Sequence, residues 1–294
     1  MLRPLTIILS AFGLITGCSS PTEAVAPAKP GLWKVSDHDT TIYLFGTIHM
    51  LPPDYAWRTK NFDKAAAQAN ELMLEVVMDK DPAKTAEIMT RLGRSPGLPP
   101  LLDRVPQEKR AELKTIIESA KIPMDFLDGM ETWAAATTLA ATTLAQANIR
   151  ASDGVERQLT GSFEKAGKTV AGLETTEQQL GYFDTLPETV QRQFLLSVID
   201  SSKDAEGEFH KMMSAWASGD TSKIAMTFDD ELQMTPELTD VLLRKRNQNW
   251  TRWVKARMDT PGTVLMAVGA GHLAGKESVQ EMLKAEGLKV KRIQ

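Results

Sequence analysis

Two of the four histidines in the 294-residue chain stand in the same local pattern, three positions after a glycine. Gly46 and His49 follow the apolar run "IYLF", and Gly269 and His272 follow "VLMAV". Both runs indicate strands, and open α/β sheets bind ligands beyond the carboxyl ends of their strands. We therefore expect the two imidazoles at one edge of a sheet, where the glycines allow a sharp turn and leave room for a ligand or metal ion.

Two glutamates occupy similar positions near the ends of apolar runs. Glu75 lies in "LMLEVV", and Glu174 ends "KTVAGLE". A buried carboxylate without a partner is unfavourable, so each is expected to be paired or to coordinate a cation. Imidazole and carboxylate ligands suit a divalent transition metal ion such as Zn²⁺, Mn²⁺, Co²⁺ or Fe²⁺. The pattern predicts that His49 and His272 bind such an ion with one glutamate, while the other glutamate is a general base of raised pKa.

Each of these residues also has a purely structural interpretation. Glu75 could end an ordinary strand and pair with a lysine, and Glu174 could cap the next helix together with a neighbouring threonine. A single Gly-x-x-His pattern arises often by chance, so a structural role for either histidine stays open. The other two histidines are assigned no role, because His38 lies in a predicted turn and His210 in a helical pattern.

The elements that must position these residues alternate between short strands and long helical stretches. A hairpin is predicted over residues 32–46, and further strands are predicted over 72–77, 168–174, 263–272 and 288–294. Helical patterns lie between them, over 61–71, 81–148, 153–167, 176–257 and 276–287. The apolar helix within 132–147 is interpreted as a buried core helix, because it is too short and too rich in threonine for a membrane span. The predicted fold class is α/β, with a small central mixed sheet and large helical insertions.

The first eighteen residues have the features of a bacterial lipoprotein signal peptide. Arg3 precedes a short apolar segment, and Leu14 to Cys18, "LITGC", resembles a lipobox that would leave Cys18 for lipidation. An ordinary secretory signal is the alternative. Residues 19–30 are small, polar and proline-rich and are predicted to be a flexible tether, which leaves 31–294 as one domain. Because Ser19 follows the cysteine, we expect an outer-membrane lipoprotein that faces the periplasm of a Gram-negative bacterium.

Composition excludes several classes of function. The net charge of −4 and the mixed charges give no basic stripe, so nucleic acid is not an expected partner. Cys18 is the only cysteine, so the domain has no disulfide of its own and no cysteine nucleophile. The chain contains neither a His-Glu-x-x-His pattern nor a Gly-x-Ser-x-Gly elbow, which argues against a zincin and an α/β-hydrolase.

The paired Gly-x-x-His motifs resemble those of the TraB/GumN (TraB/PrgY/GumN, TIKI-like) family. The resemblance covers most of the chain from residue 31 and extends to "GKTVAGLETTEQQL", "AWASGD", "RNQNW" and "VGAGHLAGKESVQEMLKAEGLKVKRI". It implies a metal-dependent protease in which His49, His272 and Glu75 form the catalytic set, with Glu174 at the later acidic position. Arg246 and Asn247 match the family's Arg-Asn pair.

The resemblance leaves open what Arg246 does. It could hold a substrate carboxylate or orient Glu75, and an ion pair on a helix surface is the structural alternative. The chain also departs from the family pattern, because no second acidic residue follows Glu75 directly and Asp79 is displaced. This departure weakens a two-carboxylate metal site.

Two classes of function follow. The first is a metal-dependent hydrolase, a peptidase acting on a peptide or protein, attached to the membrane through lipidated Cys18. The second is a non-catalytic lipoprotein that binds a metal ion, haem or a peptide in the same crevice. Glu75 discriminates between them, because a binding protein does not need a spare buried carboxylate.

Overall fold

The fold is described from a computed structural model of the chain, over residues 28–146, 149, 154–231 and 235–294. The predicted signal peptide, its lipobox cysteine Cys18 and residues 19–27 of the predicted tether lie outside the described residues. The last three tether residues are packed, because Ala28 is buried and the Lys29 N–H donates to the Ala217 carbonyl at 2.7 Å. The fold thus begins by Ala28, slightly before the expected boundary at Gly31.

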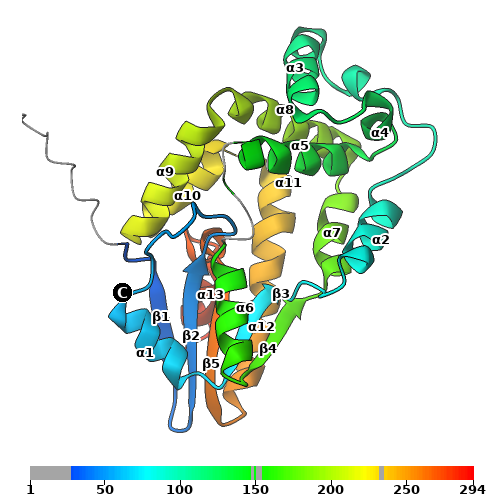
Figure 1. Cartoon of the computed structure of the whole chain (residues 1–294). Helices are drawn as coiled ribbons and strands as arrows, with labels where there is room; N and C mark the ends of the chain where they lie inside the picture. Colours follow the sequence, from blue (N-terminus) through cyan, green and yellow to red (C-terminus); the bar gives the residue numbers. More distant parts are fainter. Residues whose placement is uncertain (1–27, 147–148, 150–153, 232–234) are drawn as a thin grey trace, which may run out of the picture.

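The described strands form a mixed six-stranded sheet in the order β4-β3-β5-β2-β1-β6, as Figure 1 shows. Antiparallel pairing involves only β1, which joins β2 and β6, and the other neighbouring pairs are parallel. This confirms the predicted α/β class and mixed sheet. The strand bounds are β1 (Leu32–Ser36), β2 (Thr40–Thr47), β3 (Glu71–Val76), β4 (Thr169–Glu174), β5 (Gly262–Gly269) and β6 (Val290–Arg292).

The central strands are apolar on both faces because helices cover both sides of the sheet. In β2, Tyr43 and Phe45 pack into one core, whereas Ile42 and Leu44 pack into the other. The first core also contains side chains of α1 (Lys60–Gln68), α6 (Val155–Lys165) and α9 (Ala205–Ser218). The second contains side chains of α12 (Lys245–Met258) and α13 (Val279–Ala285), which lie behind the sheet in Figure 1.

A group of helices with a core of its own lies beyond the carboxyl end of the sheet, at the top of Figure 1. Trp133 and Leu139 of the predicted core helix are fully buried in it, which confirms the interpretation of that segment. No helix among the described residues is both long and apolar enough to cross a membrane. The group contains α3 (Arg110–Ala120), α4 (Met124–Asp128), α5 (Thr132–Gln146) and α8 (Glu188–Ser201).

The remaining helices connect this group to the sheet. They are α2 (Pro82–Leu92), α7 (Thr176–Asp184), α10 (Thr221–Glu231), α11 (Pro236–Thr239) and the π-helix η5 (Asp240–Arg244), with the short 3-10 helices η1 (Leu101–Arg104), η2 (Gln107–Lys109), η4 (Ser202–Asp204) and η6 (Ala270–Leu273). The π-helix passes directly into α12, and η6 directly follows β5. Both junctions matter for the site, because Arg246 lies just after the π-helix and His272 lies in η6. Turns of π-helix occur often at functional positions.

Candidate functional site

The sheet register brings both Gly-x-x-His motifs to one edge. Strands β2 and β5 are parallel neighbours, and Thr47 pairs with Gly269 where both strands end. His49 follows two residues after β2, and His272 lies in η6 directly beyond β5. Glu75 is one residue from the end of β3, and Glu174 is the last residue of β4. The carboxyl ends of four parallel strands therefore carry the candidate groups to the same edge.

The missing side chain of Gly269 opens a space among these groups. A Cβ atom at this position would lie 3.1 Å from Glu75 Oε1, 3.7 Å from His49 Nε2 and 3.7 Å from His272 Cδ2. At Gly46 it would lie 3.3 Å from the Cα of Ala270, so this glycine lets η6 pack closely on β2. Neither glycine is among the described residues with positive φ. Their role is therefore close approach, and the sharp turn expected from the sequence is not the reason for them.

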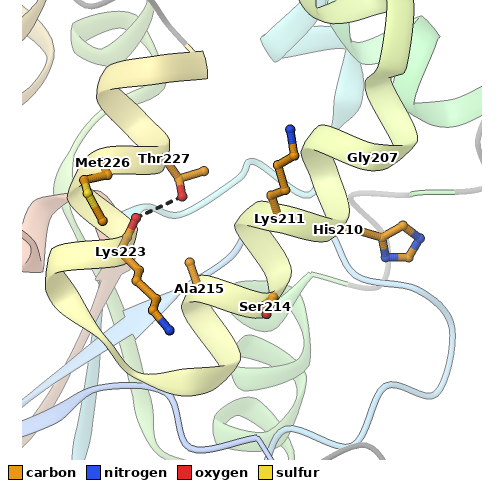
Figure 2. A pocket seen from close by; sticks show the side chains of 8 residues that line it. All are labelled: Gly207, His210, Lys211, Ser214, Ala215, Lys223, Met226 and Thr227. Atoms are coloured by element: carbon orange, nitrogen blue, oxygen red, sulfur yellow. Dashed lines mark hydrogen bonds between the residues drawn. The ribbon is translucent and has the colours of Figure 1, made fainter. Parts of the chain in front are cut away.

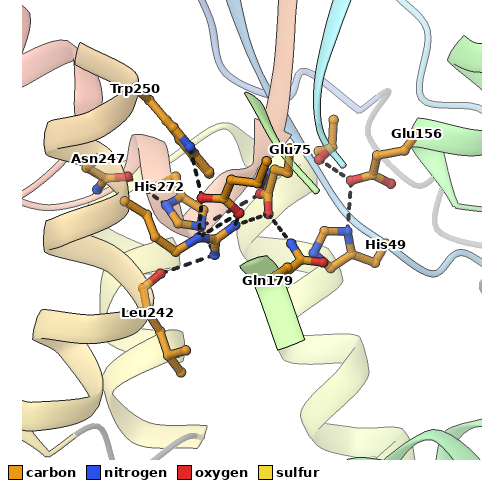
Figure 3. Close-up of polar contacts among 12 residues, drawn as sticks. His49, Glu75, Glu156, Gln179, Leu242, Asn247, Trp250 and His272 are labelled. Atoms are coloured by element: carbon orange, nitrogen blue, oxygen red, sulfur yellow. Dashed lines mark hydrogen bonds and ion pairs between the residues drawn. The ribbon is translucent and has the colours of Figure 1, made fainter. Parts of the chain in front are cut away.

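Arg246 is the hub of the site, and Figure 3 labels several of its partners, among them Glu75, His272 and Leu242. Its Nε and Nη2 donate to Glu174 at 2.9 and 2.8 Å, and Nη2 also donates to Glu75 Oε2 at 2.7 Å. Its Nη1 donates to His272 Nε2 at 3.0 Å and to the Leu242 carbonyl on the π-helix at 3.2 Å. These contacts use all five N–H donors of the guanidinium.

The aromatic rings around Arg246 complete its enclosure. Its guanidinium carbon lies 4.8 Å from the ring centre of Trp250 and 5.6 Å from that of Tyr182, within the range of cation–π attraction. Trp250 Nε1 also donates to Glu174. With Arg246 only 7% exposed, the surface ion pair considered for it is wrong. Its hydrogen bond to Glu75 agrees with a role in orienting that carboxylate, and a contact with a substrate carboxylate stays a prediction. Glu174 is not the cap of α7 either, since Thr175 forms the capping box with Gln178.

Both ring nitrogens of His272 are engaged. Asn247 Nδ2 donates to the Glu277 carbonyl, so Asn247 Oδ1 must accept the proton of His272 Nδ1, at 2.6 Å. The other ring nitrogen, Nε2, is then the acceptor for Arg246. Burial, helped by Arg246 and opposed by Glu75, lowers the pKa of His272 to about 3. His272 is therefore neutral at pH 7, and its lone pair points at a guanidinium.

Glu75 differs from the base of raised pKa that the sequence predicts. Its Oε1 accepts the Gly269 N–H at 2.7 Å, and its Oε2 accepts from Gln179 Nε2 at 3.2 Å in addition to Arg246. Burial raises the pKa of Glu75, but the attraction of His272, which is protonated in that acidic range, of Arg246 and of His49 outweighs it and brings the pKa to about 2. The raised pKa expected of the base is therefore not found at Glu75, because the sequence does not show that a guanidinium lies against this carboxylate.

His49 is held from outside the cluster by Glu156, which the sequence did not single out. His49 Nδ1 donates to Glu156 Oε1 at 2.8 Å, and Thr47 Oγ1 donates to the same oxygen. The Val155 N–H donates to the Ile48 carbonyl, which docks the first turn of α6 against the end of β2. No local signal in "DGVERQL" marks Glu156, because its role depends on this docking. With Nδ1 engaged, the Nε2 of His49 is the ring atom left to face the space at Gly269.

Glu156 gives His49 an electrostatic state opposite to that of His272. The attraction of Glu156, helped by Glu75 and opposed by the partial loss of solvent around the ring, raises the pKa of His49 to about 9. The His49 side chain is 65% exposed, so solvent screens part of this attraction. At neutral pH the site thus holds a protonated His49 that faces an ionised Glu75, and a neutral His272 behind them.

We predict that Glu156→Gln lowers the pKa of His49 by about one to three pH units, because it removes one close opposite charge. An NMR titration of the histidine ring protons measures this, with His49→Ala to assign the resonance. Glu164→Gln is the matched control, since Glu164 lies on the same helix but pairs with Lys80. Equal titration curves of His49 in the wild-type chain and in Glu156→Gln would show that the His49–Glu156 pair does not form in solution.

The predicted site residues thus form one cluster, but they do not assemble a metal centre in this arrangement. His272 and both glutamates already hold Arg246, so the two imidazoles do not offer two free nitrogens to one ion. Among the described residues, one group of acidic and histidine side chains is compact enough for a shared ion: Asp37, His38 and Asp39, in the exposed turn at the opposite end of β2. Asp79 is exposed and bonded to Lys84. The divalent ion therefore stays a prediction.

An open groove lies between α9 and α10, apart from this cluster. Figure 2 shows its lining, which includes His210, Lys211 and Met226. None of the site residues lines it. Its position supports no link to the chemistry at the sheet edge.

The comparison with known proteins identifies the family of the chain. The sequence profile of the TraB/PrgY/gumN family matches residues 31–292. The chain belongs to this family. It is 27% identical over 249 residues to the protein named "Uncharacterized protein YbaP" of Escherichia coli (strain K12), across 82% of this chain and 87% of that relative. The YbaP protein of Shigella flexneri matches to the same extent, and no solved structure matches the chain.

Proposed function

We propose that this TraB/PrgY/gumN family member is a hydrolase that cleaves peptide bonds at the sheet edge around Gly269. The proposal rests on the pair formed by Glu75 and His49. The two side chains carry opposite charges and both face Gly269, which has no side chain. Peptide substrates are proposed from the family resemblance. The lipobox pattern at Cys18 supports attachment to the outer membrane on its periplasmic side, with membrane and a peptide or protein as partners.

The pair can divide the two proton transfers of hydrolysis. In the space at Gly269, Glu75 Oε1 takes a proton from the attacking water, whose oxygen bonds to the scissile carbonyl carbon. Protonated His49 Nε2 then gives its proton to the leaving nitrogen as the carbon–nitrogen bond breaks. The proton on Glu75 returns to His49, which restores the starting state. Groups whose environments push their pKa values apart are suited to such a division.

The surrounding residues hold this pair in place. The Gly269 N–H and Arg246 fix the two oxygens of Glu75, and Glu156 fixes the imidazole of His49. A carboxylate with a pKa of about 2 is a weak base, so much of its contribution must come from orienting the water. Because Gly269 has no side chain, Glu75 Oε1 and His49 Nε2 can both approach this position closely.

The proposal is tested by incubating the full chain, purified in detergent, with a library of defined peptides and identifying products by mass spectrometry. His49→Gln, which keeps a polar side chain but has no titratable ring, is the matched control. Products from the wild-type chain that His49→Gln does not form support a hydrolase. Peptides that bind to both proteins without cleavage would instead favour the binding function, and products formed equally by both would place any activity elsewhere.

We predict that Gly269→Ala reduces turnover by about 10²-fold while the chain still folds. Its φ of −48° suits alanine, but the methyl group would lie only 3.1 Å from Glu75 Oε1, so the carboxylate must shift from its position. Steady-state rates on a peptide found in the screen measure this. Gly161→Ala on α6 is the control, because a Cβ there has no atom within 4 Å. An unchanged rate in Gly269→Ala would show that the reacting groups do not meet at this space.

A further inference from the structure

We infer that Arg246 is the resident cation of this site and occupies the place that a metal ion would need among Glu75, Glu174 and His272. These three residues then form a latent metal site that only removal of the arginine side chain opens. The inference is independent of the proposed hydrolysis. It also differs from the metal-binding role that the family resemblance implies for His272.

Every N–H donor of Arg246 is already bonded, so a metal ion can take its place only by breaking these hydrogen bonds. Its five N–H groups are shared among two carboxylates, one imidazole nitrogen and one carbonyl, and the side chain is almost fully buried. An ion entering here would have to displace the guanidinium from all of these acceptors. Each broken contact would leave a buried donor without an acceptor, which is unfavourable. A competing ion must therefore recover a large free energy before it binds.

The acceptors around Arg246 are nevertheless of the types that bind transition metals. Two carboxylates and one neutral imidazole nitrogen converge on one cation, which matches the mixed nitrogen and oxygen ligands of hydrolytic metal sites. Asn247 holds the proton on His272 Nδ1, as second-layer acceptors do in metal sites. Without the guanidinium, two buried negative charges would lack a counter-ion, and a divalent cation would supply one.

The π-helix explains how the arginine reaches this position. Within η5 the Lys245 N–H bonds to the Asp240 carbonyl, five residues earlier, so the turn is wider than an α-helical one. Arg246 follows directly at the start of α12, and its Nη1 bonds back to the Leu242 carbonyl of that turn. The π-helix thus sets the rotation of α12 at which Arg246 points between Glu75 and Glu174.

Metal content and metal binding test this inference without any measurement of activity. The full chain and its variants are stripped with a chelator, offered Co²⁺, Zn²⁺ or Mn²⁺, and analysed by mass spectrometry of the metal and by calorimetry. We expect no ion in the wild-type chain that depends on His272. Arg246→Ala should bind about one ion per chain, with the visible absorption of protein-bound Co²⁺, and Arg246→Ala/His272→Ala should lose it. Arg246→Met is the control whose side chain refills the space without charge.

The metal content of the wild-type chain tests the inference even if Arg246→Ala does not fold. A nearly stoichiometric ion in the wild-type chain that His272→Ala removes would overturn it, because Arg246 would then have to leave. A folded Arg246→Ala that binds no ion would overturn the latent site. Cleavage of peptides in the presence of chelator is scored separately, so failure of the proposed hydrolysis is distinguishable from failure of this inference.

Discussion

Replacing Arg246 by methionine is expected to lower the free energy of unfolding by about 3–5 kcal/mol, because it leaves two buried carboxylates without their counter-ion. Glu75 and Glu174 are 5% and 8% exposed, so water cannot replace the lost guanidinium. Removing one partner of a buried ion pair is far more costly than removing one on the surface. The midpoint and slope of urea unfolding, followed by circular dichroism, measure the change.

A surface pair and a double variant serve as controls for this prediction. Arg91→Met breaks an exposed pair with Glu177 and should cost ~1 kcal/mol or less. Adding Glu174→Gln to Arg246→Met removes one stranded charge, so the arginine substitution should cost less in that background. Equal costs for Arg246→Met and Arg91→Met would contradict the network of charges around Arg246.

The fold was largely predictable because its strands carry their own signals. The run of β-branched and aromatic residues in β2 indicates a strand, and the glycines near the ends of β2 and β5 mark where these strands stop. The sequence does not reveal the pairing order, in which β5 enters between β2 and β3. That order is a matter of long-range packing, and it is what brings Gly269 beside both His49 and Glu75.

The residues of the site could be predicted from the sequence, but the contacts between them could not. His49, His272, Glu75 and Glu174 were identified from their types and positions, and Arg246 from the family resemblance. The structure brings all five into one cluster. The sequence could not show which atom of each side chain bonds to which neighbour. Two imidazoles and two carboxylates suggest a metal ion until the five donors of a guanidinium are found among them.

Glu156 shows the same limit in a different form. It lies in a helix with ordinary amphipathic spacing, and its partners Thr47 and His49 come from a strand end more than one hundred residues earlier. A carboxylate that orients a histidine can come from any element that reaches the ring. Only the docking of α6 against β2, through the Val155 N–H, selects this one.

The two glutamates left equivalent by the sequence are expected to differ sharply in their effect on turnover. Glu75→Gln should reduce kcat by about 10²–10⁴-fold, the contribution of a positioned proton acceptor. Glu174→Gln should change kcat by less than about tenfold, because Glu174 accepts only from Arg246 and Trp250 in the hydrogen bonds described and lies outside the contacts of the Gly269 space. Initial rates on one peptide substrate at several concentrations separate kcat from KM.

The comparison is sharp because the two substitutions disturb the fold in the same way. Each replaces a carboxylate oxygen that accepts from Arg246 with an amide, so each places an N–H group near a donor or weakens an ion pair. Urea unfolding of both variants checks that they lose similar stability. If Glu174→Gln lost as much turnover as Glu75→Gln, the activity would depend on the integrity of the Arg246 network as a whole. A large loss confined to Glu75→Gln would assign the proton acceptor, because only Glu75 exposes an oxygen to the space that His49 also faces.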